Sequence, residues 1–262
     1  MSHIVKTDAV VLKSMKYRET SMIVTLYTKQ FGKISGIVKG ARQTKNKFGS
    51  ALQPMAYVAL VLYKKEKRDL QMVTQCDVIT SFRGLTEDIE KMAVGMSMVE
   101  LIANIAHEEE ENEPLFTLLV DSLAAVNHAT KYPTNVFYYF ELKLAELLGF
   151  QPRFDDCISC RTQVVRSDNI GEIIAYHLGR GGPLCANCSA VPGQLKKLSV
   201  HSLHILKHIT ACDAFDVVFD IDIDYHAKEE INGFLWDYLK HHISGMRALK
   251  SSRVFSQILN AS

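Results

Sequence analysis

The sequence of 262 residues lacks the features that would place a protein in a membrane or outside the cell. Its first residues have no charged start followed by a long apolar stretch and a small-residue cleavage site, as a secretory signal does. The longest uncharged apolar stretch, residues 55–63, has about half the length that a membrane-spanning helix needs. We therefore expect a cytoplasmic protein, and we exclude membrane transport and membrane catalysis.

The sequence also lacks the motifs of several enzyme classes. It contains no Gly-x-x-x-x-Gly-Lys-Ser/Thr loop, and residues 179–183 do not fit a dinucleotide-binding fingerprint. His107 and Glu109 supply the first half of a zinc deaminase signature, but Leu184 interrupts the second half. A calcium loop starting at Asp220 fails because Tyr225 replaces the required glycine. The sequence predicts a binding protein and no enzyme.

The chain has almost no excess of either charge, because 30 basic residues nearly balance 29 acidic ones. The charges are nevertheless unevenly distributed along the sequence. Residues 1–80 carry 14 Lys/Arg against 5 Asp/Glu, a net charge of +9. Residues 81–150 carry 4 against 12, a net charge of −8, and residues 151–262 carry 12 against 12. A small basic region fused to an acidic one indicates that the basic part meets a polyanion such as nucleic acid.

The basic region is rich in Val, Ile, Thr and Tyr, and apolar residues often alternate with polar ones, as in strands. The five expected strands are residues 4–12, 21–27, 34–38, 55–63 and 70–79. Turn residues separate them, including Lys16-Tyr17-Arg18 and Phe31-Gly32-Lys33. Five short strands in about 80 residues suit a small closed barrel, and the OB-fold is the five-stranded barrel that binds oligonucleotides. An SH3-like barrel remains possible.

Beyond residue 80 the apolar residues recur at helical spacing. Thr86 is the expected cap of the first helix, Pro114 opens the second, and the third covers residues 134–148 and ends at Gly149. The predicted fold class is multidomain α+β, with an OB-fold barrel at residues 1–80 and an all-helical domain at residues 81–262. A four-cysteine zinc module is inserted in that domain at about residues 153–192.

The cysteines give the sharpest local signal. Cys157 and Cys160 form one C-x-x-C pair, and Cys185 and Cys188 form a second pair, with 24 residues between them. A two-residue gap lets both sulfur atoms of a pair point at one ion, and four thiolates complete the tetrahedral shell of Zn²⁺. Four protein ligands leave no open position for a substrate, so we predict a structural zinc site.

Disulfides and a redox dithiol are the competing interpretations of these cysteines. A cytoplasmic location argues against disulfides, and a redox C-x-x-C motif needs no second copy. A zinc hydrolase would require an open ligand position. His177 lies between the two pairs, but four cysteines already fill the metal shell.

Basic residues in the loops and strand ends of the expected barrel are candidate DNA contacts, because they can neutralise phosphates. These candidates are Lys16, Arg18, Lys33, Lys39, Arg42, Lys45 and Lys47. Tyr17, Tyr27, Phe31 and Phe48 lie among them, and an exposed aromatic ring can stack on an unpaired base. Tyr27 and Phe31 are as well explained by a place in the core.

The order of several short motifs resembles the RecO family of recombination mediators. Lys16-Tyr17-Arg18-Glu19-Thr20, Phe31-Gly32-Lys33 and Lys39-Gly40-Ala41-Arg42 are similar to its amino-terminal domain. Leu147-Leu148-Gly149-Phe150 before the first cysteine pair, residues 182–188, and Leu249-Lys250-Ser251-Ser252-Arg253 continue the resemblance. It covers nearly the whole chain, and the joint order of the motifs is more specific than any one of them.

The resemblance implies an OB-fold joined to a helical domain with a zinc module, and a protein that is no enzyme. It further implies binding of single- and double-stranded DNA and annealing of complementary strands. With RecR as partner, members of the family help RecA replace single-strand-binding protein on DNA, which implies a cytoplasmic, nucleoid-associated location. By the same resemblance, Lys16, Arg18, Lys33, Lys39 and Arg42 are the DNA contacts.

Two other functions stay open on the sequence alone. An RNA-binding translation or transcription factor is one, because barrels with zinc ribbons are common in that class, and competition between DNA and RNA would separate the two. A protein-interaction scaffold with a structural zinc module is the other. In that case charge reversal at Lys39 and Arg42 would leave function intact.

Overall fold

A computed structural model describes residues 2–43, 48–65, 68–166, 169, 171–249 and 251. The chain divides into two compact units. The first comprises residues 1–128 with 247–254, and the second comprises residues 129–246 with 255–262. No helix in the described ranges combines the length and the apolar character that crossing a membrane requires.

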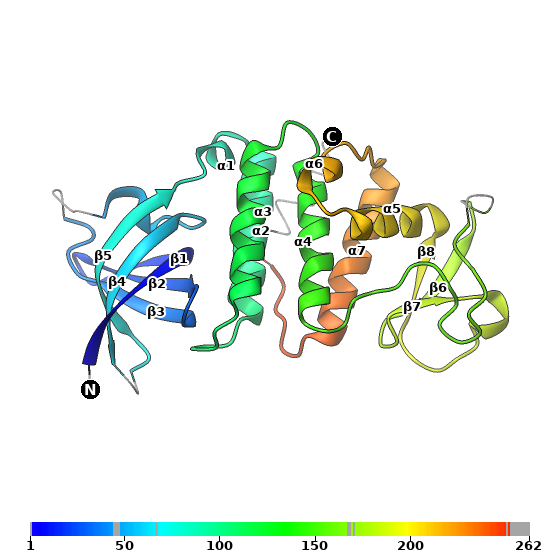
Figure 1. Cartoon of the computed structure of the whole chain (residues 1–262), viewed down its shortest axis with the longest axis horizontal. Coiled ribbons are helices and arrows are strands. Elements are labelled where there is room, and N and C mark those ends of the chain that lie inside the picture. Colours follow the sequence, from blue (N-terminus) through cyan, green and yellow to red (C-terminus); the bar gives the residue numbers. More distant parts are fainter. Residues whose placement is uncertain are drawn as a thin grey trace. The chain divides into compact units, whose positions relative to one another are not determined.

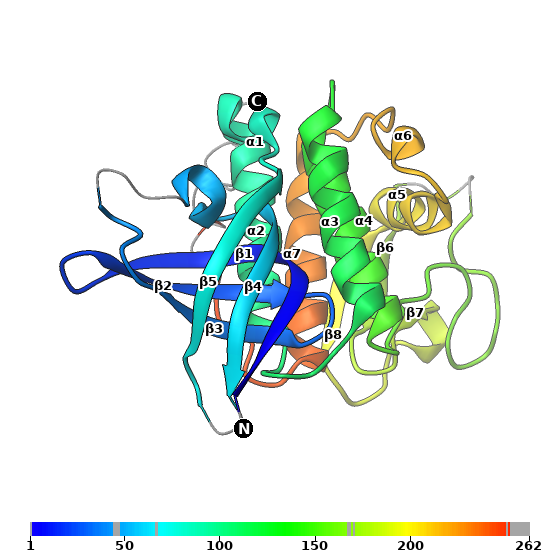
Figure 2. The ribbon, with the colours of Figure 1, turned by 60° about the vertical axis from the view of Figure 1, so that its left-hand side comes forward.

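The first unit begins with five strands that form a closed barrel (Figures 1 and 2). They are β1 (Ser2–Tyr17), β2 (Ser21–Thr28), β3 (Gly32–Val38), β4 (Tyr57–Lys65) and β5 (Gln71–Thr80). The order around the barrel is β1-β2-β3-β5-β4; β3 and β5 pair in parallel, and the other neighbouring strands pair antiparallel. The long β1 pairs with β4 through its first half and with β2 through its second half, which lets one strand close the sheet.

Alternation of side chains along the strands builds the barrel core. In β3, Ile34, Gly36 and Val38 are buried while the residues between them are half-buried, as expected for a strand with one face inside. Val24 and Leu26 of β2 and Leu60 and Leu62 of β4 belong to the same core cluster. Burial of these apolar side chains is the main stabilising term of the barrel.

The connection between β3 and β4 closes one side of this core. The short 3-10 helix η1 (Gly49–Leu52) buries Ala51 and Leu52, and Phe48 just before it is only 6% exposed. Lys45 and Lys47 belong to the same connection and lie outside the described residues.

The first unit continues with the helices α1 (Arg83–Glu87), α2 (Ile89–Ile105) and α3 (Glu113–His128). The expected cap at Thr86 is wrong, because Thr86 lies inside α1 and Asp88 caps α2. The Asp88 carboxylate accepts a hydrogen bond from the Lys91 amide at 3.0 Å. An aspartate carboxylate at this position satisfies an orphan amide, so Asp88 fulfils the role assigned to the threonine hydroxyl.

The second unit joins helices to a small sheet (Figure 1). Its helices are α4 (Pro133–Leu147), α5 (Val200–Ala211), α6 (Phe215–Val218) and α7 (Tyr225–His242). Its strands β6 (Ile173–His177), β7 (Gly182–Leu184) and β8 (Leu195–Ser199) form a three-stranded antiparallel sheet, and η2 (Ala186–Cys188) follows β7. Tyr176 of β6 packs edge-on against Phe234 of α7 at 4.8 Å between ring centroids, which ties the sheet to the helices.

The change from strands to helices occurs near residue 80, as the sequence predicts, and the mixed α+β class is confirmed. The first strand is longer than predicted, since Lys16 and Tyr17 still belong to β1 and the turn consists of residues 18–20. The compact units follow contacts rather than element type, because α2 and α3 pack in the unit of the barrel. The boundary at residue 80 between a nucleic-acid-binding domain and a helical domain stays a prediction.

Candidate nucleic-acid interface and metal site

Two connections at one end of the barrel bring together the basic residues of separate motifs. The β1–β2 turn contains Arg18 in the left-handed conformation, with φ of 51°. Arg42, after β3, donates from Nη1 to the carbonyl oxygens of Arg18 at 3.2 Å and Glu19 at 3.0 Å. The Arg42 amide also donates to the Thr20 carbonyl at 2.9 Å. Arg42 therefore holds the turn in place, and we call residues 17–21 with 39–43 the open end of the barrel.

A shallow hollow of about 660 Å³ lies at the open end. Its lining comprises Tyr17, Arg18, Glu19, Thr20, Ser21, Ile37, Lys39, Gly40 and Gln43. The Arg18 guanidinium carbon lies 5.3 Å from the centre of the Tyr17 ring, within the range of a cation–π contact. Lys16, Arg18, Lys39 and Arg42 are exposed, so their charges face solvent beside this hollow. Phosphate groups fit such a surface, and Glu19 is its one carboxylate.

The other end of β2 and β3 is occupied by an acidic segment. Residues 106–112 connect α2 to α3, and we call residues 108–113, which end at the first residue of α3, the acidic linker. The Glu109 amide donates to the Lys33 carbonyl at 3.0 Å, extending the edge of β3. Gly32 touches the linker so closely that an added Cβ would lie 2.0 Å from the Glu110 carbonyl oxygen. We call the β2–β3 turn with Lys64 the covered end of the barrel.

Lysines at the covered end are paired with the acidic linker. Lys29 lies 2.9 Å from the Glu113 carboxylate, and this hydrogen bond and the attraction of the charge raise the pKa of Lys29. Lys64 lies 3.1 Å from the Glu109 carboxylate. Burial, with a smaller contribution from the negative charge of Glu110, raises the pKa of Tyr27 to about 12. The positive charge of this end is therefore largely balanced within the chain.

Lys33 belongs to the covered end and not to the open end. Its ammonium donates to the Ala103 carbonyl at 3.2 Å, near the end of α2. A lysine that closes off a helix carbonyl is positioned by the fold, so its charge contributes less to an external phosphate site. Of the other described candidates, Arg18, Lys39 and Arg42 come together at the open end, and Lys16 lies just before it in β1.

The four aromatic candidates fall into different environments. Tyr27 is fully buried, and Phe48 is buried in the barrel core, so neither ring offers an exposed face to a base. Turn composition cannot reveal that η1 folds the Phe48 ring inward. Phe31 is half-buried beneath Lys64, whose Nζ lies 5.4 Å from the ring centre. Tyr17 alone among the four lines the hollow at the open end.

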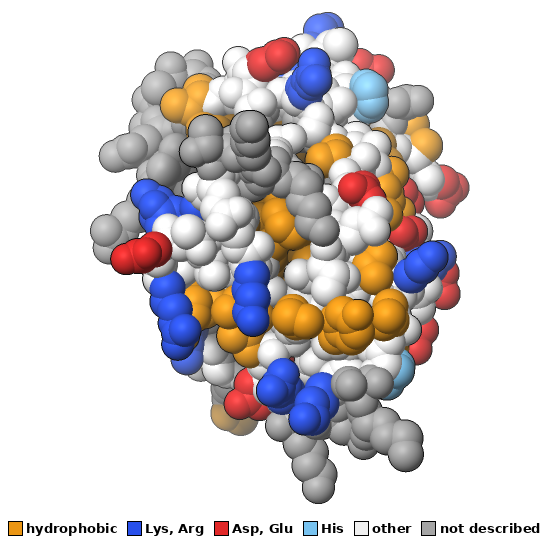
Figure 3. Space-filling model, turned by 90° about the vertical axis from the view of Figure 1, so that its left-hand side faces the viewer, with side chains coloured by type: hydrophobic (Ala, Val, Ile, Leu, Met, Phe, Trp, Pro, Cys, Tyr) orange, Lys and Arg blue, Asp and Glu red, His pale blue; other side chains and the backbone are white. Residues whose placement is uncertain are grey.

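Figure 3 shows the barrel side of the molecule, where a band of apolar side chains is bordered by Lys and Arg side chains. The alternation of apolar and polar residues along the strands does not predict this band. The signal for the band lies in strand register, which a single sequence does not give.

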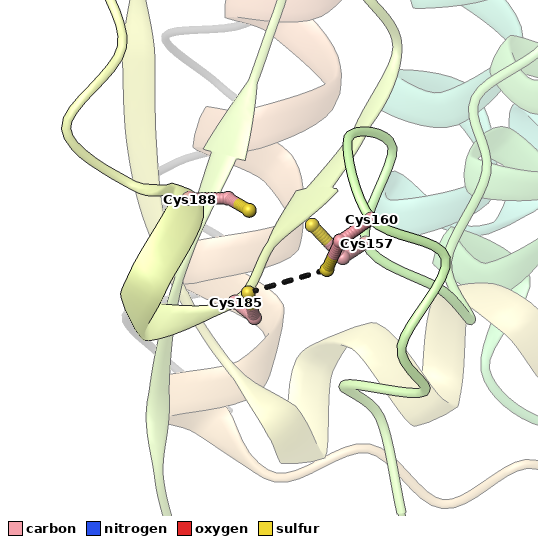
Figure 4. Close-up of side chains that lie close together, drawn as sticks. All are labelled: Cys157, Cys160, Cys185 and Cys188. Carbon is pink, nitrogen blue, oxygen red and sulfur yellow. Dashed lines mark hydrogen bonds between the residues drawn. The ribbon is translucent and has the colours of Figure 1, made fainter.

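The cysteines of the second unit converge as predicted (Figure 4). The sulfur atoms of Cys157, Cys160, Cys185 and Cys188 all lie within 4.8 Å of one another. The Ile158 amide donates to the Pro183 carbonyl at 3.0 Å, joining the first knuckle to the strand before the second. Gly182 is required here, because an added Cβ would lie 2.2 Å from Ile158 Cγ2.

The dimensions of this cluster suit one zinc ion. Zinc–sulfur bonds of about 2.3 Å in a tetrahedron place sulfur atoms about 3.8 Å apart. Cys160 Sγ and Cys185 Sγ lie 3.6 Å apart. His177 is engaged elsewhere: its Nδ1 accepts from the Arg180 amide at 3.3 Å and its Nε2 lies 3.3 Å from the Pro192 carbonyl.

Hydrogen bonds shift the pKa values of the thiols in the cluster. Cys160 Sγ lies 3.4 Å from the Thr162 hydroxyl oxygen, and this hydrogen bond lowers the pKa of the Cys160 thiol to about 6. Hydrogen bonds with Cys185 and Cys160 raise the pKa of Cys188 to about 12, because the thiols compete for negative charge. The thiolate is the metal-binding form, so a bound cation would relieve this competition.

Comparisons with known proteins identify the family. The family model described as "Recombination protein O N terminal" matches residues 1–82, and the one described as "Recombination protein O C terminal" matches residues 86–253. The chain belongs to the RecO family. The DNA repair protein RecO of Salinibacter ruber is 34% identical over 258 residues, which cover 98% of this chain and 95% of that protein. RecO of Chlorobium limicola is 36% identical, with 98% and 99% of the two chains covered.

Membership in the RecO family confirms the resemblance inferred from the ordered motifs. RecO of Pelodictyon phaeoclathratiforme is also similar, at 31% identity over 98% of this chain and 99% of that protein. These names belong to DNA repair and recombination, and the matches extend through both units of the chain.

Proposed function

We propose that this protein is a recombination mediator in DNA repair. It binds single- and double-stranded DNA, anneals complementary strands and, with RecR, helps load RecA on DNA coated by single-strand-binding protein. It acts in the cytoplasm at the nucleoid and performs no chemical step. The observation that carries the proposal is RecO family membership along nearly the whole chain, joined to a cluster of exposed cations at one end of the barrel.

Residues 1–80 are the proposed DNA-binding domain, and the barrel is proposed to be an OB-fold. The strand order with a parallel β3–β5 pair, and a short helix between β3 and β4, support this assignment. Lys16, Arg18, Lys39 and Arg42 are the proposed phosphate contacts, with Lys45 and Lys47 beside them in sequence. Lys33 contributes least, because its ammonium is bonded to Ala103.

Annealing follows from the same surface. Two DNA strands repel each other, and a basic surface that screens both backbones lowers the barrier to pairing without reading bases. Four phosphate contacts on a single strand predict a slope of about −2.8 in a plot of log affinity against log salt concentration, at about −0.7 per contact. A phosphate contact by Lys45 or by Lys47 would each steepen this slope by about a further 0.7.

Fluorescence anisotropy of a labelled single strand at several salt concentrations tests the binding, and energy transfer between two labelled complementary strands tests annealing. We expect salt-sensitive binding and annealing faster than in protein-free solution. Absence of binding at low salt would contradict the proposal and favour a protein scaffold. An RNA strand of the same sequence that competes better than DNA would favour an RNA-binding factor.

The four cysteines are proposed to hold one structural Zn²⁺. With four thiolate ligands the ion has no open position, so it joins the two knuckles and supplies folding free energy to a segment with a small core. We expect about one zinc ion per chain by elemental analysis. Cys185→Ser should lower that content strongly, while the control Cys212→Ala, which alters a buried cysteine outside the cluster, should not. Equal zinc content in both variants would contradict the assignment.

A further inference from the structure

The two cysteine pairs of the metal site are held by different parts of the second unit (Figure 4). Cys185 caps η2 directly after β7, and Cys188 is the last residue of η2, so the sheet positions the second pair. Cys157 and Cys160 belong to a turn outside the strands. One bond that closes this turn is local, since the Arg161 amide donates to the Cys157 carbonyl at 2.9 Å. The first pair therefore needs contacts from outside the turn to keep a fixed place beside the second.

Arg180 supplies such a contact from the turn between β6 and β7. Its Nη1 donates to the Ser159 hydroxyl at 3.2 Å, and its Nη2 donates to the Ile158 carbonyl at 3.3 Å. Ile158 and Ser159 are the two residues between the cysteines of the first pair. One planar guanidinium therefore bonds to both residues that separate two metal ligands, which a lysine ammonium has no fork to do.

The same hairpin holds Ile158 from a second side. The Ile158 amide donates to the Pro183 carbonyl of β7 at 3.0 Å, so both backbone polar groups of Ile158 are bonded to the β6–β7 hairpin. The Ile158 side chain is buried and lies against Gly182. Arg180 extends this attachment from Ile158 to Ser159. The first pair is thus joined to the hairpin that leads into the second pair.

His177 in turn holds the backbone of Arg180. The Arg180 amide donates to His177 Nδ1 at 3.3 Å, so this nitrogen accepts and the imidazole proton lies on Nε2. Nε2 can then donate to the Pro192 carbonyl, which lies 3.3 Å away. The place of a buried histidine between the two cysteine pairs is therefore explained by positioning of the β6–β7 turn and not by metal ligation.

Amides of the first turn face one of the metal ligands. The Ser159 and Cys160 amides donate to Cys157 Sγ. Groups outside the metal shell that orient the ligands matter for binding, and loss of one typically lowers metal affinity about 10- to 100-fold. If the turn moved, both amides would lose their direction and the two sulfur atoms of the pair would lose their spacing.

We infer that Arg180 is a positioning residue of the zinc site, which holds the first cysteine pair in metal-binding geometry by bonding Ile158 and Ser159 to the β6–β7 turn. The inference rests on the proposed structural zinc and adds a residue outside the four ligands. Arg180 and Ser159 are exposed, so their bond adds little to the stability of the fold. The loss of Arg180 should therefore appear in zinc affinity more than in folding.

Competition with a chromophoric zinc chelator measures the zinc affinity of the whole chain. Arg180→Gln should lower that affinity about tenfold, at the lower end of the expected range because the contacts are exposed. At saturating zinc the variant should still bind as much zinc as the unmodified protein. Arg180→Lys keeps the charge but cannot make both bonds from one planar group, so its affinity should fall nearly as far.

Two further variants separate the bridge from its surroundings. Arg161→Gln is the matched control for charge, because Arg161 follows Cys160 directly and is exposed, and we expect its zinc affinity to change by less than about twofold. Ser159→Ala removes one acceptor of the bridge. The loss caused by Arg180→Gln should be smaller in the Ser159→Ala background, since both changes remove the same bond. Thermal unfolding of each variant checks that it folds.

Equal zinc affinity of Arg180→Gln and the unmodified protein would overturn the inference and leave the zinc site intact. Full affinity in Arg180→Lys, or equal losses in Arg180→Gln and Arg161→Gln, would also overturn it, because charge and not the bridge would then be responsible. An unmodified protein that binds no zinc would overturn the proposed zinc site itself.

Discussion

The two ends of the barrel contain similar basic residues but use them differently. At the covered end, Lys29 and Lys64 pair with carboxylates of the acidic linker, and Lys33 bonds to a helix carbonyl. At the open end, the Arg42 guanidinium donates to the Arg18 carbonyl, and the Arg18 guanidinium lies over the Tyr17 ring, while both side chains remain exposed. The net charge of +9 on residues 1–80 is therefore not spread evenly over the barrel. The difference teaches that the location of a polyanion site depends on which cations the chain itself neutralises.

The largest expected effect is the loss of DNA affinity on charge reversal at the open end, compared with the same change at the covered end. Lys39→Glu/Arg42→Glu should lower affinity for a single strand about 100-fold at low salt, because two contacts are replaced by repulsion. Lys29→Glu/Lys64→Glu at the covered end should change affinity by less than about threefold, because these lysines already face carboxylates. Anisotropy titrations of both variants give the comparison. Similar losses in the two variants would mean that both ends bind DNA.

A glycine substitution tests how firmly the linker covers its end. Gly32→Ala should lower the free energy of unfolding by about 3 kcal/mol, because φ of 58° strains an alanine and its Cβ meets the Glu110 backbone. Gly49→Ala is the matched control in the same barrel, with φ of 48° and, among the described residues other than its chain neighbours, no atom within 4 Å of the added Cβ.

Because the control carries the backbone strain alone, it should lose only about 1 kcal/mol. Chemical denaturation measures both values. Equal losses would indicate that the linker yields without cost and does not hold the covered end.

Removing linker charge should expose the covered end to DNA. Glu109→Gln/Glu113→Gln breaks both ion pairs, so the salt slope should steepen by about 1.4, at about 0.7 for each of two released lysines. Stability should change by less than about 1 kcal/mol, because the pairs are near the surface.

Glu108→Gln/Glu111→Gln is the control of equal charge, since neither residue makes an ion pair within the described part of the chain. An equal change of slope in both variants would attribute the effect to net charge and not to the two pairs.

The smallest expected effect concerns Tyr27 beneath the linker. Burial raises its pKa from 10.0 to about 12, so the folded protein favours the neutral phenol. This contribution to stability is complete below pH 10 and is lost as the pH rises toward 12. Near neutral pH, Tyr27→Phe should change stability by less than about 1 kcal/mol, since the hydroxyl donates only a long bond of 3.5 Å to the Asn112 carbonyl.

The difference in unfolding free energy between Tyr27→Phe and the unmodified protein, measured from pH 8 upward, isolates this residue from the other tyrosines. We expect the variant to gain relative stability above pH 10. A difference that does not depend on pH would show that Tyr27 ionises as freely in the folded protein as in the unfolded chain.

Local patterns predicted much of this fold and of its sites. Alternation located the five strands, and the C-x-x-C spacing identified the four sulfur atoms that meet in the second unit. The ordered motifs around Lys16 and Arg42 identified the family. These features depend on residues that are near each other in sequence, or on motifs whose geometry is fixed by chemistry.

Long-range contacts account for what the sequence did not reveal. Lys33 has the sequence surroundings of a phosphate contact in a turn, and only the packing of α2 shows that its ammonium donates to the carbonyl of Ala103, 70 residues later. Phe48 has the surroundings of an exposed loop, but η1 places it in the core. The apolar side chains on the outside of the barrel come together through strand register, and a shift of register by one position would move every residue to the other face.

Amide hydrogen exchange with and without a single-stranded oligonucleotide tests most directly which end of the barrel binds DNA. Backbone amides that a ligand covers exchange more slowly, so the method maps the site without a substitution. We predict slower exchange at residues 17–21 and 39–43 and little change at residues 28–33 and 108–113. Protection of the β2–β3 turn and the acidic linker, with none at the open end, would contradict the account.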